Sequence, residues 1–168
     1  FILDGGECEI GLESTILDVS GASPRLLRAG GISLQALEKA CGRNIEVVGG
    51  STVALCTGMY YKDYSPKAEV LFSAYYCGMS ERIDEVYDTL VLSGKRPVIL
   101  CADFNAKKYG ERKKYEMGAD YEAYARLLFA SLRRADADGY DTVLAEGVPS
   151  DGIGAAIINR LVKSSGGK

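Results

Sequence analysis

The sequence contains no histidine among its 168 residues, and this absence excludes several classes of active site at once. Without histidine there is no Ser-His-Asp or Cys-His nucleophilic site, no histidine-bearing metal centre and no histidine acid–base chemistry. No two cysteines have the C-x-x-C spacing that a structural zinc site uses. We therefore expect neither a catalytic histidine nor a structural zinc site, and assign no residue as a metal ligand.

Long apolar runs and an excess of basic residues are also absent. The sequence has 20 Lys and Arg residues and 23 Asp and Glu residues, and the resulting net charge of −3 argues against a dominant nucleic-acid-binding surface. No apolar run reaches membrane length, and no signal-peptide pattern opens the chain. The five cysteines are an odd number at scattered spacings, which favours reduced thiols over a disulfide framework. We expect a globular, cytoplasmic protein.

Residues 1–50 predict several short strands around a single helix. FILD and STILDV have the composition of strands, and a third strand runs through PRLLR. Ser33 is a typical N-cap for a helix that ends at Gly42, and a last short strand follows it. So few elements make a thin core. Because the chain also begins at Phe1 inside a predicted strand, we expect this section to be the end of a larger domain.

Residues 51–67 form a predicted joint. Within it, CTGMYYKDYSPK carries three tyrosines, whereas flexible linkers are rich in Gly, Ser or charge and carry no aromatic anchors. Pro66 favours an extended conformation before it and excludes a continuing helix. We expect an extended strap that places Tyr64 over a cleft, with Lys62 near phosphate. The alternative is that the tyrosines only tie the two sections together.

Residues 68–168 predict alternating strands and helices. Strands are expected over 68–76, 96–102 and 141–145, and helices after the caps Ser80 and Asp120 and from Ile153 to Ser164, with Tyr121 and Tyr124 in the core. This alternation is typical of a parallel sheet with helices on both faces. We predict a small Rossmann-like three-layer α/β domain.

Two features of this section have the composition of phosphate or partner sites. A basic run lies in a predicted loop between Asp103 and Met117, but interrupting acidic residues and the acidic overall charge favour a solvated loop. Gly152-Ile153-Gly154 opens a helix as dinucleotide fingerprints do, yet the third small residue is displaced and no ribose-binding acid can follow at the required distance. We expect a solvated loop for the basic run and no phosphate binding at the glycine segment. The basic run comprises Lys107, Lys108, Arg112, Lys113 and Lys114.

The first candidate for chemistry is the pair Ser14 and Arg28. If the strands around them pair, a small hydroxyl and a guanidinium can face one cavity, and arginine supplies the forked donor that phosphate or carboxylate requires. The alternative is that Ser14 only fills a strand and Arg28 is a surface charge.

Four motifs occur in an order that resembles a known family. They are DGGECEIGLESTILDV, LLRAGGIS, TGMYYKDYSP and AAIINRL. Together they resemble the long form of the threonylcarbamoyl-AMP synthases, which are YrdC-like enzymes with an added C-terminal domain. The resemblance implies a C-terminal remnant of the YrdC-like α+β catalytic domain over 1–50, a linker that acts as a lid over 51–67, and the Rossmann-like extension domain over 68–168.

The resemblance also implies a function. The family makes threonylcarbamoyl-AMP from L-threonine, bicarbonate and ATP, with magnesium expected beside the ATP, as the first step toward threonylcarbamoyladenosine in certain tRNAs. It implies that Ser14 contacts L-threonine, that Arg28 contacts the nucleotide phosphates, and that Tyr64 closes over the site. The lid segment reads DYSP, with Asp63 where histidine is common, and Thr57 stands where the family usually has proline. Other proteins of the threonylcarbamoyl-transfer pathway are expected partners, whereas direct tRNA binding is not.

Part of the family's site has no counterpart in this sequence. The catalytic domain of the family carries a lysine and arginine pair and a Ser-Ala-Asn motif that bind threonine and ATP, and neither occurs here. We therefore expect the chain to be inactive alone. A second hypothesis is a noncatalytic module that binds a nucleotide or a protein at the carboxyl ends of its strands, near Asp103 and Gly147.

Overall fold

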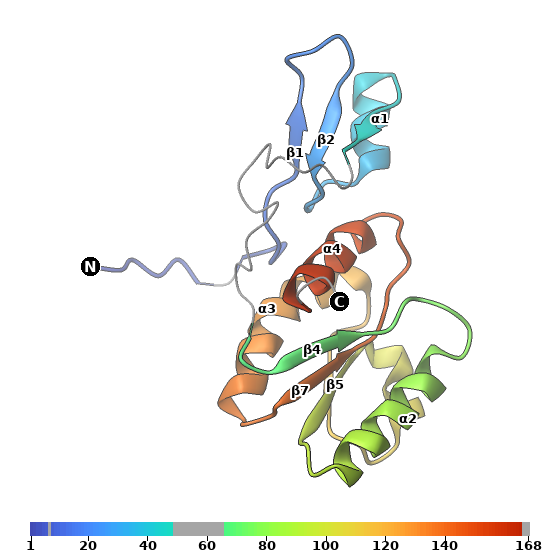
Figure 1. The fold of residues 1–168 in the computed structure, drawn as a ribbon. Helices are drawn as coiled ribbons and strands as arrows, with labels where there is room; N and C mark the ends of the chain where they lie inside the picture. The colour runs from blue at the N-terminus through green and yellow to red at the C-terminus, as the bar shows by residue number, and fades with distance from the viewer. Residues whose placement is uncertain (7, 49–65, 166–168) are drawn as a thin grey trace.

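Two separate sheets, one in each half of the chain, organise the structure (Figure 1). The structure is a computed structural model that describes residues 1–6, 8–48 and 66–165. The first sheet has three strands in the order β1-β2-β3, and the second has four in the order β4-β7-β5-β6.

The first sheet lies within residues 16–47 and carries one helix. Its elements are β1 Ile16–Asp18, β2 Arg25–Arg28, α1 Leu34–Cys41 and β3 Glu46–Val47. Strands β1 and β2 are antiparallel, whereas β2 and β3 are parallel and are joined through α1. The predicted helix is confirmed, because the Ser33 hydroxyl accepts from Ala36 N at 3.2 Å and Gly42 ends the helix at a φ of 65°.

The strand predicted at the start of the chain is wrong. Residues 1–4 form no strand, and Phe1, Ile2 and Leu3 are exposed. A strand needs a neighbour to accept and donate its backbone hydrogen bonds. Among the described residues none pairs with this segment, so its apolar composition has nothing to pack against.

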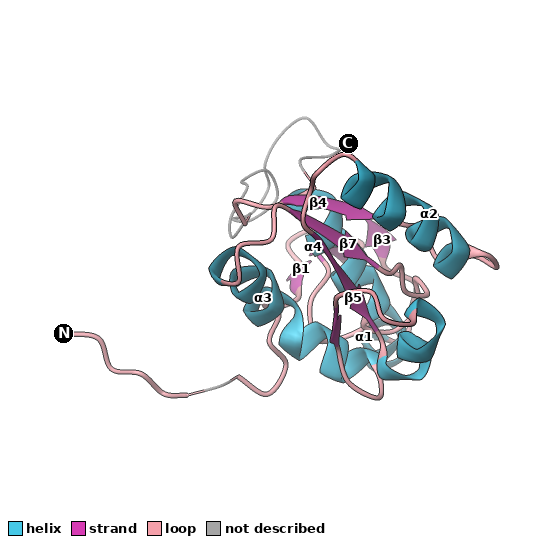
Figure 2. Cartoon of the chain, turned by 90° about the horizontal axis from the view of Figure 1, so that it is seen from below, coloured by secondary structure: helices cyan, strands magenta, loops and turns pink. Residues whose placement is uncertain are grey.

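The second sheet is entirely parallel and is covered by helices on both faces (Figure 2). Its elements are β4 Glu69–Phe72, α2 Met79–Leu92, β5 Pro97–Cys101, the 3₁₀ helix η1 Asp103–Tyr109, β6 Lys114–Glu116, α3 Tyr121–Ala137, β7 Thr142–Ala145 and α4 Gly154–Ser164. This arrangement confirms the predicted Rossmann-like α/β fold.

Strand β5 shows how the sequence specifies the two faces, because all five of its residues are buried. Val98 and Leu100 lie in the core cluster that contains residues of α3 and α4, whereas Ile99 and Cys101 lie in the cluster that contains residues of α2 and η1. Successive side chains of a strand point to opposite faces, so a continuously apolar run is what a doubly covered strand requires. The two residues before β4 are bound to α3, because the Asp136 carboxylate accepts from the backbone N–H groups of Lys67 and Ala68, each at 2.9 Å.

Two local predictions in this half are wrong. Ser80 does not cap α2, because the helix begins at Met79 and its N-cap is Gly78. The φ of Gly78 is 92°, a backbone conformation that residues with a Cβ rarely adopt. The segment predicted as a loop contains η1 and β6. The strand was missed because only Tyr115 of its three residues is buried, which is too short a pattern to recognise.

The basic run is part of the fold. Arg112 forms ion pairs with Asp84 and Asp88 of α2, at 3.3 and 2.7 Å. Lys113 donates its backbone N–H to the Tyr87 hydroxyl at 3.1 Å. These contacts fasten the turn before β6 to α2 and use the charge of Arg112, whereas Lys107, Lys108 and Lys113 are exposed.

The Gly152-Ile153-Gly154 segment also has a structural explanation. A Cβ at Gly154 would lie 3.0 Å from the carbonyl carbon of Pro149 and closer still to its oxygen, so the first turn of α4 needs glycine there.

Among the described cysteines, Cys8, Cys41, Cys77 and Cys101 form no disulfide. In the described part of the chain, no helix is both long enough and apolar enough to cross a membrane.

The two sheets should differ in local stability. Within residues 16–47 only Pro24, Leu26 and Ile45 have buried apolar side chains, whereas the second sheet has a core on each face. We predict that the amides of β1–β3 exchange with solvent at least about tenfold faster than those of β5 and β7, measured by hydrogen–deuterium exchange and mass spectrometry. Equal protection in a monomeric sample would contradict this expectation.

Candidate functional site

The structure brings the predicted pair together at the start of β1. Arg28, the last residue of β2, donates from Nε to the backbone carbonyl of Ser14 at 3.0 Å and from Nη2 to its hydroxyl at 3.0 Å. The antiparallel pairing of Ile16 with Arg28 places the guanidinium beside the residues that precede β1. The hydroxyl and the guanidinium therefore meet, although Ser14 is not among the residues that line the cavity beside Arg28, and their role in binding stays a prediction.

A close backbone approach fixes this pair. A Cβ at Gly30 would lie 2.5 Å from the carbonyl carbon of Ser14 and would also overlap the backbone of Glu13 and Thr15. The Thr15 hydroxyl accepts from the N–H of Ile32 and donates to its carbonyl, both at 3.0 Å. The GLEST and LLRAGG segments thus form one unit, which only glycine at position 30 allows.

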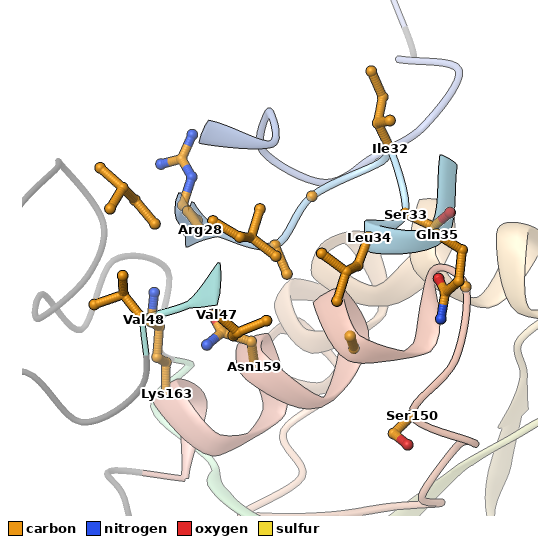
Figure 3. Close-up of a pocket in the computed structure, with 16 residues that line it drawn as sticks. Arg28, Ile32, Ser33, Leu34, Gln35, Val47, Val48, Ser150, Asn159 and Lys163 are labelled. Carbon is orange, nitrogen blue, oxygen red and sulfur yellow. The ribbon is translucent and has the colours of Figure 1, made fainter. Parts of the chain in front are cut away.

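A cavity of about 460 Å³ lies between this unit and α4 (Figure 3). Residues of β2, β3 and α1 line one side, and Asn159 and Lys163 of α4 line the other. Arg28 lies at one edge with its guanidinium turned toward β1. The polar side chains at its rim and the apolar ones between them could receive a ligand with an anionic and an apolar part. The apolar lining includes Leu26, Leu34, Val47 and Val48.

Glu13, the residue before Ser14, forms an ion pair that the sequence did not predict. Its carboxylate accepts from Nε of Arg160, whose side chain is only 2% exposed. Partial burial would raise the pKa of Glu13, but the hydrogen bond from its own backbone N–H and the interactions with Arg160 outweigh burial and lower the pKa. Glu13 is therefore ionised at neutral pH. The signal in the sequence was an arginine inside the apolar run AAIINRL, where an unpaired charge would be costly.

The other predicted site residues lie outside the described part of the chain. Lys62 and Tyr64 belong to the segment 49–65, as do Thr57 and Asp63. Their contacts to the Ser14–Arg28 pair stay predictions.

Part of the carboxyl edge of the second sheet is occupied by the chain's own contacts, although a cavity of about 340 Å³ remains beside the ends of β4 and β7. Glu146 follows β7 and is 2% exposed, and it accepts from Ala102 N at 2.9 Å and from the Tyr109 hydroxyl at 2.5 Å. Asp103 accepts from Gly118 N at 2.7 Å, and a Cβ at Gly147 would lie 2.5 Å from Tyr75 N. Asp103, Glu146 and Gly147 thus make contacts within the chain, and the second hypothesis stays a prediction.

Comparison with known proteins gives a consistent result. The family model described as threonylcarbamoyl-AMP synthase, C-terminal domain, matches residues 32–166. The chain is 37% identical over 169 residues to the threonylcarbamoyl-AMP synthase of Pyrococcus abyssi and 34% identical over 173 residues to that of Bacillus subtilis. These alignments cover 98% and 99% of this chain but 49% of each relative, so the chain spans about half the length of the curated relatives it matches.

A solved structure matches both halves of the chain. The crystal structure of Pyrococcus abyssi Sua5 complexed with L-threonine is similar with a TM-score of 0.85 and 36% identity. The match covers 98% of this chain and 48% of that chain.

The close approach at Gly30 can be tested with a single methyl group. We predict that Gly30→Ala lowers the free energy of unfolding by about 1–3 kcal/mol, because the new Cβ would push the Ser14 segment away from β2. Thermal unfolding measures the loss, and the amide resonances of residues 13–15 should shift. The matched control is Gly21→Ala, whose Cβ would meet only Ser23 O at 3.9 Å. Equal stability of the two variants would show that position 30 tolerates a side chain.

Proposed function

Since this chain belongs to the threonylcarbamoyl-AMP synthase family, we propose that it is the C-terminal portion of such an enzyme. The complete enzyme makes threonylcarbamoyl-AMP from L-threonine, bicarbonate and ATP and releases pyrophosphate. The product serves the threonylcarbamoyladenosine modification of tRNA. The observation that carries the proposal is the contact of Arg28 with Ser14, because it brings together a forked cation and a hydroxyl from two of the four motifs that resemble the family.

In this proposal Ser14 and Arg28 bind different substrates. The Ser14 hydroxyl contacts L-threonine, whose ammonium and carboxylate groups can both hydrogen-bond to a hydroxyl. Arg28 contacts the phosphates of ATP, which enters together with magnesium. Adenylyl transfer spreads negative charge over phosphate oxygens in the transition state, and a guanidinium already held in place stabilises that charge. Its hydrogen bonds to Ser14 would hold it in place.

The proposed domains follow the predicted boundaries. Residues 1–50 form the end of the catalytic domain, 51–67 the linker, and 68–168 the Rossmann-like extension domain. Tyr64 closes over the bound substrates as part of a lid, with Lys62 near phosphate. The enzyme acts in the cytoplasm, where other proteins of the threonylcarbamoyl-transfer pathway receive its product.

Replacing Arg28 by lysine tests the proposed phosphate contact. The variant is made in a protein that joins this chain to a complete YrdC-like catalytic domain. Lysine keeps the charge but loses the planar fork. We predict that Arg28→Lys lowers threonylcarbamoyl-AMP formation at least about tenfold, equivalent to about 1.4 kcal/mol of barrier. The measurement is L-threonine-dependent release of pyrophosphate from ATP.

Two controls accompany this experiment. Arg43→Lys changes an arginine of the same half of the chain that donates to Ala22 O at 3.0 Å, and its activity should stay within about twofold of the parent. The 168-residue chain alone should release no pyrophosphate, since it lacks the family's lysine–arginine pair and Ser-Ala-Asn motif. Activity of Arg28→Lys equal to that of Arg43→Lys would contradict the proposal.

A further inference from the structure

Arg160 is a charged residue on the buried side of α4. Its helical neighbours Ala156, Ile157 and Leu161 are at most 1% exposed, and the last two belong to the core on that face of the second sheet. Arg160 itself is 2% exposed. A guanidinium is seldom buried unless partners compensate its lost hydration, so its partners explain its position.

Three acceptors surround this guanidinium. Nε donates to the carboxylate of Glu13, Nη2 to the carbonyl of Ala29 at 3.2 Å, and Nη1 to Oδ1 of Asn159 at 2.7 Å. Two of the three belong to the first half of the chain. Glu13 immediately precedes Ser14, and Ala29 immediately follows Arg28.

The residues that precede Ser14 also pack against the second half of the chain. Arg126 of α3 donates from Nη1 to Glu9 O at 3.3 Å, and a Cβ at Gly11 would lie 2.7 Å from the carbonyl oxygen of Arg126. Leu12 packs against the core cluster of the second sheet. Figure 1 shows α4 between the first sheet and the second. The path of the chain up to Glu13 is therefore set by the second half of the molecule.

From these contacts we infer that Arg160 is a positioning residue, which holds Ser14 and Arg28 in register through Glu13 and Ala29. The inference rests on the proposed function, because it takes Ser14 and Arg28 to be substrate-binding residues. The planar guanidinium of Arg160 bonds to Glu13, which precedes Ser14, and to Ala29, which follows Arg28. A shift of Glu13 or Ala29 would therefore change the distance between the Ser14 hydroxyl and the Arg28 guanidinium. A displacement of about 1 Å at a binding group can cost on the order of 100-fold in rate.

The hydrogen bond between Arg160 and Glu13 depends on the charge of both side chains and on the planar shape of the guanidinium. Because Glu13 is ionised at neutral pH, its hydrogen bond with Arg160 is charge-assisted and stronger than a neutral one. Lysine at position 160 would keep the charge but could not reach the Glu13 carboxylate and the Ala29 carbonyl with the same fixed angle. Glutamine at position 13 would keep the shape of the side chain and remove the charge.

A purely structural role for Arg160 makes a different prediction. If the residue only ties the two halves together, its loss lowers stability and the amount of folded enzyme, while each folded molecule keeps its affinity for both substrates. If it positions the pair, the KM for L-threonine and the KM for ATP rise together in folded enzyme. A lower melting temperature with unchanged KM values would indicate the structural role, whereas raised KM values in folded enzyme would indicate the positioning role.

The experiment compares Arg160→Lys with Glu13→Gln in the protein that joins this chain to a complete catalytic domain. We expect both KM values to rise at least about tenfold in each variant. The double variant should be no worse than the poorer single one, because both changes remove the same contact. Glu13→Gln keeps the test valid if Arg160→Lys does not fold, since the side chain of Glu13 is 28% exposed. The control is Arg82→Lys, on α2, which pairs with Glu85 at 3.1 Å and should leave both KM values unchanged.

Two further measurements distinguish the possible failures. Ser14→Ala and Arg28→Lys are assayed in parallel, and unchanged KM values in both would overturn the proposed function and this inference with it. Raised values there, but unchanged values in folded Arg160→Lys and Glu13→Gln, would overturn the positioning role alone. In the 168-residue chain, Arg160→Lys should speed exchange of the Ile32 amide, which donates to Thr15 Oγ1, at least about tenfold without affecting β5. An unchanged Ile32 rate would also overturn the inference.

Discussion

A buried guanidinium connects the two halves of this molecule, and the remaining geometry of the candidate site depends on it. A charge as deeply buried as Arg160 requires an opposite charge or several acceptors, because hydration is no longer available to it. Glu13 supplies the charge, and Ala29 and Asn159 supply further acceptors. Since Glu13 precedes β1 and Ala29 follows β2, a single side chain of α4 contacts the chain segments of both strands at one end of the pair.

Helix α4 therefore has two functions in the fold. Ile157 and Leu161 pack into the core of the second sheet, whereas Asn159 and Lys163 line the cavity below the first. With the roles proposed for Ser14 and Arg28, the second half of the chain would influence substrate binding through positioning, without contributing a catalytic group. At its own carboxyl-end edge, where many doubly wound folds bind ligands, Glu146 bonds to Ala102 and Tyr109, and a separate cavity lies beside the ends of β4 and β7.

The elements with strong local signals could be predicted from the sequence. Helices α1 and α3 begin after Ser33 and Asp120, whose side chains accept from the N–H three residues on, and β5 is an uninterrupted apolar run. Strand β6 and the start of α2 were missed, because one buried tyrosine and one left-handed glycine leave little pattern. An exposed apolar start was predicted as a strand, since composition does not reveal whether a partner strand is present.

The candidate site was predictable only in part. Ser14 and Arg28 are 14 residues apart and meet because two adjacent strands pair, which is a local event. Glu13 and Arg160 are 147 residues apart, and no periodicity or spacing connects them. An arginine within an apolar helical face indicates that a partner exists, but the partner's identity depends on how the two sheets pack.

The most direct test of this account is a crystal structure of the chain, joined to a complete catalytic domain, with L-threonine bound. The account predicts that L-threonine lies within hydrogen-bond distance of the Ser14 hydroxyl, and that Arg160 still contacts Glu13 and Ala29. A structure with L-threonine bound away from Ser14, or with Arg160 separated from Glu13 while the site is occupied, would contradict it.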